Sequence, residues 1–527
     1  MRVTTRPKAR VASRLAIAPL LLAAFASVDC GSRSTLLEGE DPRTPCVTDL
    51  DCGPPDACGV SVCAASFCVR RELDCDDGDP CTEDRCSSTA GCVHRELTRD
   101  EDGDGHNKPR PGFDPDDAQS CGDDCDDTNK NVYPGNTETC DAVDNDCNGI
   151  VDDRAQYRLS STPPVRVTGM ENKRADCSSL LSVGDSFVAA CDGRQGTIRR
   201  SFLVGLNASG KKLFETFVSD INAESYAGTM AWSGTELWTA WDDARDSQFD
   251  IFLARFNSFG DKLAPSTRIS NARGFSLHPD VRFTGSEFVI VWDDRRGEED
   301  VTGDFSRIFA QRVDVTGQLI GRNQVLIAND PVPENPALAV NGKAFGVAYT
   351  STRQEVLSDP RVGFRTFSNT LEPLGSAELF SNEAHGPSSY WLQDRYVVLW
   401  SEYKDQTGPG SNIFAASFSP NAKPIVAPRS IVSGTARRHP PQAVSLGDRL
   451  LVVWSELVGD QYDLFWQVID ADLQTLSPPQ RITSTADETL SPTLAIGPGG
   501  RVGLLYNDAT PTQSMQAYFT TFECRPQ

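Results

Sequence analysis

Residues 288–296 read FVIVWDDRR: an apolar run closed by a tryptophan, then two acids and two bases. Six more stretches have the same pattern, an apolar run that ends in one particular residue, usually an aromatic one. They are FVAACDG, LWTAWDDAR, FGVAYTSTR, YVVLWSEYK, LLVVWSELV and VGLLYNDAT. The seven closing residues, with spacings of 50, 51, 57, 51, 54 and 52 residues, are Cys191, Trp241, Trp292, Tyr349, Trp400, Trp454 and Tyr506. Seven copies at this period indicate a repeat architecture.

Each copy contains four short apolar segments. In the third copy these are HPDVRFTG, FVIVW, IFAQRVD and QVLIA, and none shows helical periodicity. Such segments between turns predict strands, so we expect each copy to form one four-stranded antiparallel blade. Seven blades close a β-propeller, which we place at residues 157–527. The predicted fold class is therefore all-β, with small, disulfide-rich, helix-poor modules ahead of the ring.

The last copy predicts how the ring closes. It ends at AYFTTFEC, residues 517–524, without a fourth strand, whereas VRVTG at residues 165–169 precedes the first copy. We expect VRVTG to complete the last blade, because a strand from the start of the ring removes an exposed sheet edge.

The first thirty residues have the composition of an export signal. Five basic residues precede an apolar run at residues 15–26, which is too short to span a bilayer. The pattern resembles a bacterial lipoprotein signal, which implies lipidation of the first following cysteine, Cys30. We therefore expect residues 1–30 to be a lipoprotein-type signal peptide and 31–45 a linker, with a lipid anchor at the outer membrane or cell surface. The alternative is an ordinary cleaved signal and a secreted or periplasmic protein.

Negative charge is concentrated ahead of the predicted ring. Residues 31–156 contain 31 Asp or Glu and 11 Lys or Arg, whereas the whole chain has a formal net charge of −24. This balance excludes nucleic acid and anionic lipid as partners of the region and favours cations.

Residues 46–97 contain nine cysteines and almost no aliphatic runs, which predicts a module held by disulfides rather than by an apolar core. Its second half resembles the short Cys-rich repeats of bacterial surface proteins. The CxxC pairs and flanking histidines typical of zinc modules are missing.

Cysteine positions also constrain the ring. Cys177 and Cys191 flank a hairpin turn and are expected to face each other in a cross-strand disulfide. The chain has 17 cysteines, and lipidation of Cys30 would leave an even number. Cys524 has no partner in the ring, so we expect it to bond to one of the cysteines at 46–147.

Residues 98–156 contain two acidic loops with calcium-ligand spacing. In the second, Asp144, Asp146 and Asn148 supply positions 1, 3 and 5, Gly149 the bend, the Ile150 carbonyl position 7 and Asp152 position 9. The bidentate Glu expected at position 12 is missing, because Ala155 stands there.

The first loop repeats this pattern upstream. Its candidate ligands are Asp100, Asp102 and Asp104, followed by Gly105. Four further acids could complete either site: Asp123, Asp124, Asp126 and Asp127. Copper and zinc are disfavoured because only His106 is nearby. We expect Cys140 and Cys147 to be disulfide cysteines that pin the second loop.

These loops resemble the calcium loops of dockerin and thrombospondin type 3 modules. The whole segment, with CGDDCDD, YPGNTETCD and DNDCNGIVDD, resembles the metal-binding repeat of bacterial surface proteins, which implies a bound metal ion. The alternative is that the carboxylates cap turns and solvate a disulfide knot.

The repeat also places acids after its second strand: Asp242, Asp243, Asp293, Asp294, Glu402, Glu456 and Asp508. Paired carboxylates could serve a glycosidase. However, acids that recur with the repeat are better explained as caps of turns or partners of Arg245, Arg295 and Arg296. His278, His385 and His439 lie near the start of the first strand of their copies, where we interpret them as solvated loop residues.

No catalytic constellation is found, so we expect a binding protein rather than an enzyme. The favoured hypothesis is an exported, lipid-anchored surface protein for binding or adhesion, with a calcium-stabilised acidic module. Its propeller would bind an unidentified protein or glycan. The alternatives are a secreted glycan hydrolase and a structural envelope component, because a fold alone does not give a function.

Overall fold

The computed structural model describes most of the chain from residue 44 onward. The described residues are 44–111, 113, 119–139, 143–149, 156–168, 175–195, 197–219, 223–246, 248–271, 274–296, 306–328, 332–352, 360–379, 383–403, 410–485, 487–509 and 515–525. They divide into two compact units, Met1–Arg95 and Glu96–Gln527, which we describe separately.

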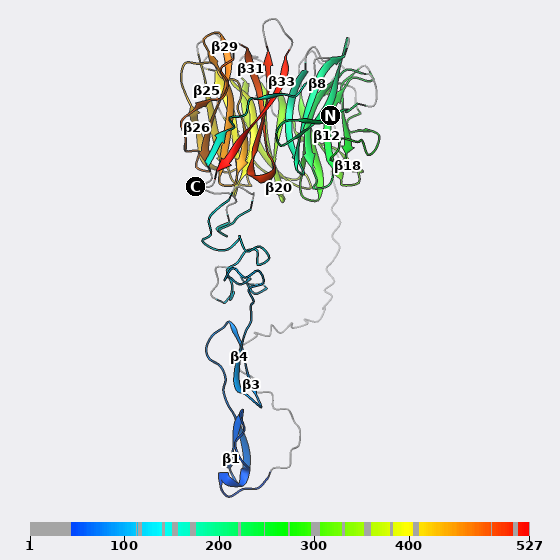
Figure 1. Cartoon of the computed structure of the whole chain (residues 1–527). Helices are drawn as coiled ribbons and strands as arrows, with labels where there is room; N and C mark the ends of the chain where they lie inside the picture. Colours follow the sequence, from blue (N-terminus) through cyan, green and yellow to red (C-terminus); the bar gives the residue numbers. More distant parts are fainter. Residues whose placement is uncertain are drawn as a thin grey trace, which may run out of the picture. The chain divides into compact units, whose positions relative to one another are not determined.

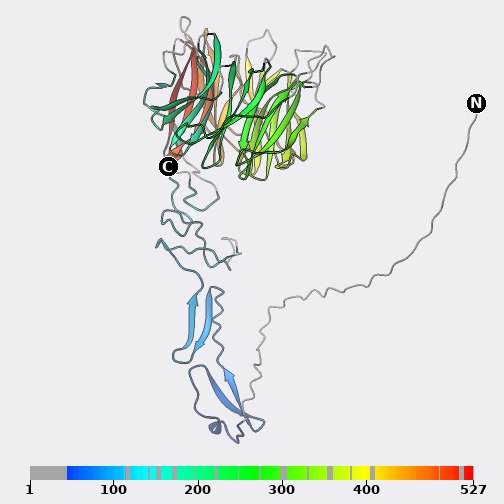
Figure 2. The same ribbon diagram turned by 90° about the vertical axis from the view of Figure 1, so that its right-hand side faces the viewer.

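The first unit contains two β-hairpins, drawn in blue in Figures 1 and 2. Its elements are η1 (Asp49–Cys52), β1 (Gly59–Ala64), β2 (Phe67–Glu72), β3 (Thr82–Ser87) and β4 (Gly91–Glu96). Four disulfides cross-link it, namely Cys46–Cys63, Cys52–Cys68, Cys58–Cys86 and Cys75–Cys92. Cys46 is its one buried apolar side chain among the described residues. As predicted, this unit is rich in disulfides and poor in apolar core.

The second unit contains the seven-bladed β-propeller that the repeat predicted (Figure 1). Its first four blades are formed by β7 (Ala175–Val183), β8 (Ser186–Gln195), β9 (Ile198–Asn207) and β10 (Lys212–Phe217); β11 (Ser225–Trp232), β12 (Leu237–Asp243), β13 (Asp250–Phe256) and β14 (Thr267–Arg268); β15 (Ser276–Phe283), β16 (Glu287–Asp294), β17 (Arg307–Asp314) and β18 (Leu319–Ile327); and β19 (Pro333–Val340), β20 (Ala344–Thr352), β21 (Pro360–Ser368) and β22 (Pro373–Leu379).

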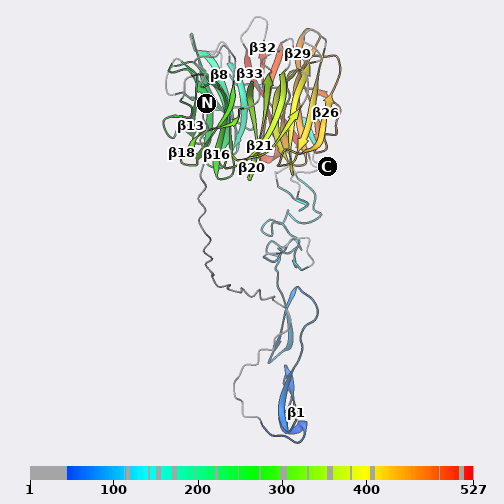
Figure 3. The same ribbon diagram turned by 180° about the vertical axis from the view of Figure 1, so that it is seen from behind.

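The remaining blades follow the same plan, and Figures 2 and 3 show the ring from two further sides. They are formed by β23 (Ala384–Leu392), β24 (Arg395–Tyr403), β25 (Ser411–Phe418) and β26 (Pro424–Val432); β27 (Gln442–Leu446), β28 (Arg449–Val458), β29 (Gln461–Asp470) and β30 (Gln480–Arg481); and β31 (Glu488–Ile496), β32 (Val502–Ala509) and β33 (Gln516–Arg525), with the short η2 (Pro498–Gly500) between β31 and β32.

Two strands from the start of the ring complete the last blade. β6 (Val165–Arg166), from the predicted VRVTG segment, pairs with β33 at Phe519 and Tyr518. β5 (Gln156–Leu159), which the sequence did not predict, pairs with the far end of β33, so that Tyr157 lies opposite Cys524. The N-terminal closure is therefore confirmed, and it uses two short strands rather than one.

The residue that closes each apolar run packs against the third strand of its own blade. Trp292 stacks on its cross-strand partner Phe309 with ring centroids 6.1 Å apart, and Trp241, Trp400 and Trp454 pair with phenylalanines in the same way. In blade 4 the partner of Tyr349 is Gly363, where an added Cβ would come within 2.2 Å of the tyrosine ring. In these blades the repeat therefore reflects the packing of one buried ring against the third strand.

In blade 1 a disulfide takes the place of this ring. Cys177 and Cys191 lie opposite each other on β7 and β8 and are bonded to each other, which is the pairing expected from the sequence.

Candidate functional site

The first acidic loop gathers three carboxylates around a tight turn. The Asp100 carboxylate accepts hydrogen bonds from the backbone amides of Gly103 (2.6 Å) and Gly105 (2.9 Å). Both glycines have positive φ angles, 86° and 102°, a backbone conformation that residues other than Gly rarely adopt. Asp100, Asp102 and Asp104 can each offer one oxygen, and these oxygens lie within 4.8 Å of one another. The structure therefore brings together all three acids proposed for this loop.

The second loop has the same hydrogen-bonded turn. Asp144 accepts the backbone amide of Gly149 at 2.7 Å, matching the bond between Asp100 and Gly105, and also that of Asn148 at 3.2 Å. Asp146 accepts the Asn148 amide at 3.2 Å. Ile150 and Asp152, proposed as further ligands, lie outside the described residues.

A third carboxylate reaches this loop from upstream. Glu138 Oε1 accepts the backbone amide of Asp146 at 2.9 Å, and oxygens of Glu138, Asp144 and Asp146 lie within 4.8 Å of one another. Sequence reasoning missed Glu138 because the calcium-loop template places its closing acid downstream, at position 12. The loop obtains its third acid from the segment that precedes it.

Several carboxylate oxygens of these acids are shielded from solvent and accept no hydrogen bond. Asp102 Oδ2, Asp104 Oδ2, Asp124 Oδ2 and Glu138 Oε2 are buried and have no hydrogen-bond partner. Buried polar atoms normally have one, and a buried carboxylate oxygen without one is costly. A cation coordinated by these oxygens would remove that cost, so the residues present fit a bound metal ion.

Burial and mutual repulsion raise the pKa values of acids in this module. For Asp124, which is 1% exposed, burial is the main cause, and the charges of Asp104 and Asp102 add to it. Burial is likewise the main cause of the raised pKa of Glu138, with repulsion from Asp146 and Asp144. Both shifts have the direction expected for carboxylates gathered without a counter-charge.

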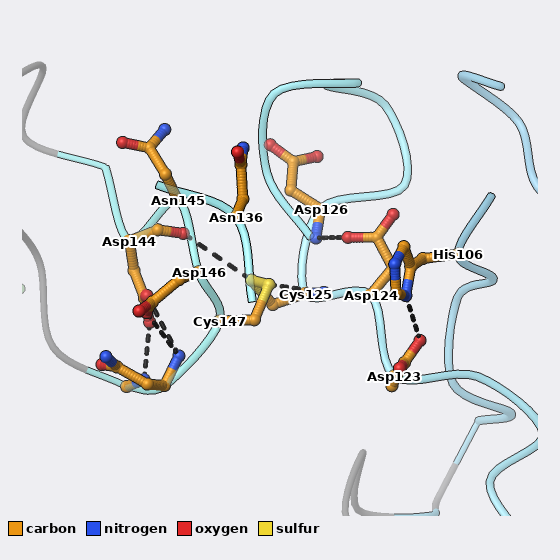
Figure 4. The surroundings of a disulfide bond; sticks show 12 residues. His106, Asp123, Asp124, Cys125, Asp126, Asn136, Asp144, Asn145, Asp146 and Cys147 are labelled. Atoms are coloured by element: carbon orange, nitrogen blue, oxygen red, sulfur yellow. Dashed lines mark hydrogen bonds and ion pairs between the residues drawn. A yellow bond between two sulfur atoms is a disulfide. The ribbon is translucent and has the colours of Figure 1, made fainter. Parts of the chain in front are cut away.

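A disulfide ties the second loop to Asp124 (Figure 4). Cys147, inside the loop, is bonded to Cys125, the neighbour of Asp124. Cys147 was expected to be a disulfide cysteine that pins this loop, and its partner is Cys125. Cys140, expected to share that role, lies outside the described residues.

His106 is engaged elsewhere. Its ring stacks on Tyr133 with centroids 5.2 Å apart, and its Nδ1 lies 3.0 Å from Asp123 Oδ1. The hydrogen bond to Asp123 is the main cause of its raised pKa. Asp123 is therefore paired with a histidine and belongs to neither of the two acidic triads, Asp100–Asp102–Asp104 and Glu138–Asp144–Asp146.

A mixed cluster lies in the first unit, on the hairpin of β3 and β4. His94 Nδ1 is 2.7 Å from Asp84 and 3.2 Å from Asp77. The sequence did not single out this cluster. The His94 ring nitrogen contacts both carboxylates, and these contacts explain why the three side chains lie together.

In the ring, the acid two residues after the tryptophan of each W-D-D or W-S-E motif accepts a hydrogen bond from the indole N–H. The Nε1 distances are 3.2 Å for Trp241 to Asp243 and 2.7 Å for Trp292 to Asp294, with matching bonds to Glu402 and Glu456. Arg245 and Arg296 pair with the same two aspartates. These acids therefore bind groups at the end of the second strand of their own blade, and two of them pair with an arginine, as their recurrence suggested.

The three histidines near the first strands have aromatic or acidic neighbours. His278 Nδ1 lies 2.8 Å from Asp293, while the rings of His385 and His439 contact Tyr403 and Tyr462. The His278 side chain is exposed, as the sequence suggested, but it lies in strand β15 rather than in a loop and is paired with an acid.

Cys524 is disulfide-bonded, as is each described cysteine of the chain. In the described part of the chain no helix is long and apolar enough to cross a membrane. The predicted signal peptide and Cys30 precede that part.

Comparison with known families supports the metal site. The family described as "Putative metal-binding motif" matches residues 124–153, which include Asp124, Glu138 and the second loop. A repeat family of the slime mould Dictyostelium matches residues 74–96. Protein psiQ of Dictyostelium discoideum is 36% identical over 69 residues, which span 13% of this chain and 7% of that protein.

Several solved structures are similar to this chain over about two thirds of its length. A protein of unknown function from Dyadobacter fermentans is 11% identical, covering 70% of this chain and 99% of its own, with a TM-score of 0.43. The β-propeller domain of a Pyrococcus furiosus protease is 10% identical, covering 67% of this chain and 96% of its own, with a TM-score of 0.43. An ulvan lyase is 10% identical, covering 68% of this chain and 96% of its own, with a TM-score of 0.47. At this similarity they assign no activity to the chain.

Proposed function

We propose that this protein is an exported, lipid-anchored surface protein for binding or adhesion, whose acidic module binds calcium. The calcium part of the proposal rests on two carboxylate groups, Asp100–Asp102–Asp104 and Glu138–Asp144–Asp146, which contain buried oxygens without a hydrogen-bond donor. Calcium is favoured over other metals because it takes six to eight oxygen ligands from carboxylates, carbonyls and water. Copper and zinc prefer sites with imidazole or thiolate, and the described cysteines of this module, Cys121, Cys125 and Cys147, are oxidised.

The module would need calcium to keep its carboxylates close. Without the ion, the raised pKa values of Asp124 and Glu138 reflect unfavourable burial of charge. Binding would therefore stabilise the folded module by mass action. In this proposal the propeller is the platform for a protein or glycan ligand, and Cys30 carries the lipid.

Calorimetric titration of the EDTA-treated full chain with calcium tests the metal proposal. We expect two sites, and Glu138→Gln should weaken or abolish one of them. Asp123→Asn is the matched control, because Asp123 pairs with His106 and belongs to neither triad. Absence of calcium binding, or unchanged binding in Glu138→Gln, would contradict the proposal.

The anchor and the platform have separate tests. Cys30→Ser should move the protein from the membrane fraction to the soluble fraction, and continued membrane association would exclude the lipid anchor. A glycan array with and without EDTA distinguishes a binding role from a structural one. Cleavage of labelled polysaccharides would instead support the hydrolase hypothesis.

A further inference from the structure

The first strands of all seven blades line one central cavity of about 1380 Å³. Most of its polar lining consists of hydroxyl and amide groups. Charged side chains are concentrated on β12 and β15, in blades 2 and 3, where Asp242, His278, Asp280 and Arg282 contribute to the wall. The cavity is large enough for a ligand of peptide or oligosaccharide size.

Blades 1 to 3 carry an acid directly after the residue that closes the apolar run. These acids are Asp192, Asp242 and Asp293, whereas blades 4 to 7 have Thr350, Ser401, Ser455 and Asn507 there. Three neighbouring blades thus present carboxylates, and the other four present neutral groups. The acids at this position of the repeat are therefore confined to one sector of the ring.

Two of the three acids have donors in the ring. Asp192 pairs with Arg199 and accepts the amide of Ala227 on the next blade. Asp293 accepts from His278 at 2.8 Å and from the backbone amide of Asn335 at 3.3 Å.

Asp242 differs from both. It is 6% exposed and lines the cavity, and no other residue in the described part of the ring donates a hydrogen bond to its carboxylate. The strand registers place Ala227 where blade 3 has His278, so blade 2 lacks the imidazole that Asp293 uses. Asp242 is thus a buried acid that faces the cavity and has no hydrogen-bond donor from another residue in the part of the ring that the structure describes.

Aromatic rings border this acid. Tyr226 lies directly opposite Asp242 on β11, and residues in this relation share a face of the sheet. The ring centroids of Phe249 and Tyr226 are 5.7 Å apart, and those of Phe275 and Phe249 are 6.2 Å apart. Phe275 is 46% exposed. All three rings line the same cavity as Asp242.

We propose that this sector binds the primary ammonium group of an organic cation, such as a lysine side chain of a protein partner. The proposal rests on the proposed role of the propeller as a recognition platform and names the ligand class. An ammonium group supplies the hydrogen-bond donors that Asp242 lacks. Its methylene stem and charge suit the aromatic faces of Phe249 and Phe275, because the Arg199 guanidinium already lies over the Tyr226 ring, 5.0 Å from its centroid.

Other ligand classes fit less well. A divalent metal ion needs several ligand atoms close together, and among the described residues no such group of acids and histidines includes Asp242. A neutral sugar would leave the buried charge of Asp242 uncompensated. A compact organic cation satisfies both the isolated carboxylate and the aromatic wall.

Saturation-transfer NMR on the full chain at pH 8 provides the test. The probe is Nα-acetyl-lysine methylamide, and its neutral counterpart is Nα-acetyl-norleucine methylamide. We expect the lysine probe alone to bind, with about tenfold or more weaker binding to Asp242→Asn, because a buried carboxylate would lose its charge. Asp508→Asn is the matched control, since Asp508 is also a buried acid but lies outside the cavity lining.

A second variant covers the case in which Asp242→Asn fails to fold. Phe275→Ala removes an exposed ring at the rim and should weaken binding several-fold. Equal binding of the norleucine probe, or unchanged lysine binding in both variants, would overturn the proposal. So would a neutral oligosaccharide that binds wild type and Asp242→Asn alike.

The calcium and lysine proposals can fail separately. Measurements in calcium and in EDTA should give the same affinity for the lysine probe. A protein that binds calcium but not the probe would refute the further inference alone.

Discussion

Replacing Asp242 by Asn should stabilise the propeller, and the gain should grow as the pH rises toward 8. Burial is the main cause that raises the pKa of Asp242 from 3.8 to about 7. The nearby charges of Asp293 and Asp192 add to the shift, and His278 opposes it. Tyr226, opposite Asp242 on β11, is a further titratable group that faces it.

The sign follows from proton linkage. Between pH 3.8 and pH 7 the folded state keeps the proton of Asp242, whereas the unfolded state loses it. Stability therefore falls as the pH rises through this range, and the full cost is present above pH 7. That cost is about 4 kcal/mol, since one pKa unit corresponds to about 1.4 kcal/mol. Asn carries no such proton, so the variant avoids the cost.

Thermal unfolding of the full chain at pH 5 and pH 8 measures this effect. From pH 5 to pH 7 the cost grows by roughly 3 kcal/mol, which for a ring of this size is about 3–4 °C in Tm. The Tm difference between Asp242→Asn and wild type should increase by this amount. The charge of Asp242 contributes to the raised pKa of His278, so the Tm difference also includes the change in the titration of His278. The other neighbouring charged groups are present in both proteins.

Asp508→Asn provides an internal control with a different midpoint. Burial is the main cause that raises the pKa of Asp508 to about 6, with contributions from Asp487 and Asp463. Its stabilisation should therefore be complete about one pH unit below that of Asp242→Asn. A Tm difference for Asp242→Asn that is equal at pH 5 and pH 8, or a loss of stability at pH 8, would refute the reasoning.

Three further predictions concern cross-links and buried charge. Replacing Cys177 and Cys191 by alanine should cost about 3 kcal/mol, given their sequence separation of 14 residues, and a lower midpoint of urea unfolding checks it. Arg438→Met should cost about 3–5 kcal/mol in the same assay, because Arg438 is 5% exposed and its loss strands a glutamate partner. Peptide mapping of the unreduced protein should link Cys524 to a cysteine at 46–147, and a free Cys524 thiol would contradict this.

The blades could be predicted because their pattern is local. Each second strand is an apolar run closed by one bulky residue, and the structure buries Trp241, Trp292, Trp400 and Trp454 almost completely. The closing strand at 165–166 could be inferred because the last copy lacked one. The additional strand β5 could not, because four residues are too few to show a period.

The metal site was predictable only in part. Local spacing indicated Asp100, Asp102 and Asp104, whose turn closes through Gly105. Glu138 comes from outside the second loop, so no loop template includes it.

Asp242 shows the same limit in the ring. It and Asp293 both follow a buried tryptophan and precede a second aspartate, so the sequence makes them equivalent. Their difference lies on another strand, where blade 3 has His278 and blade 2 has Ala227. Contacts between strands decide which of the two acids is paired.

Native mass spectrometry of the full chain in the presence of calcium, zinc and copper tests the calcium proposal most directly. The two carboxylate triads predict uptake of two calcium ions per chain, reduced to one in Glu138→Gln. They also predict that equimolar zinc or copper does not displace calcium. A chain that takes up no calcium, or one whose calcium is replaced by copper or zinc, would contradict the account.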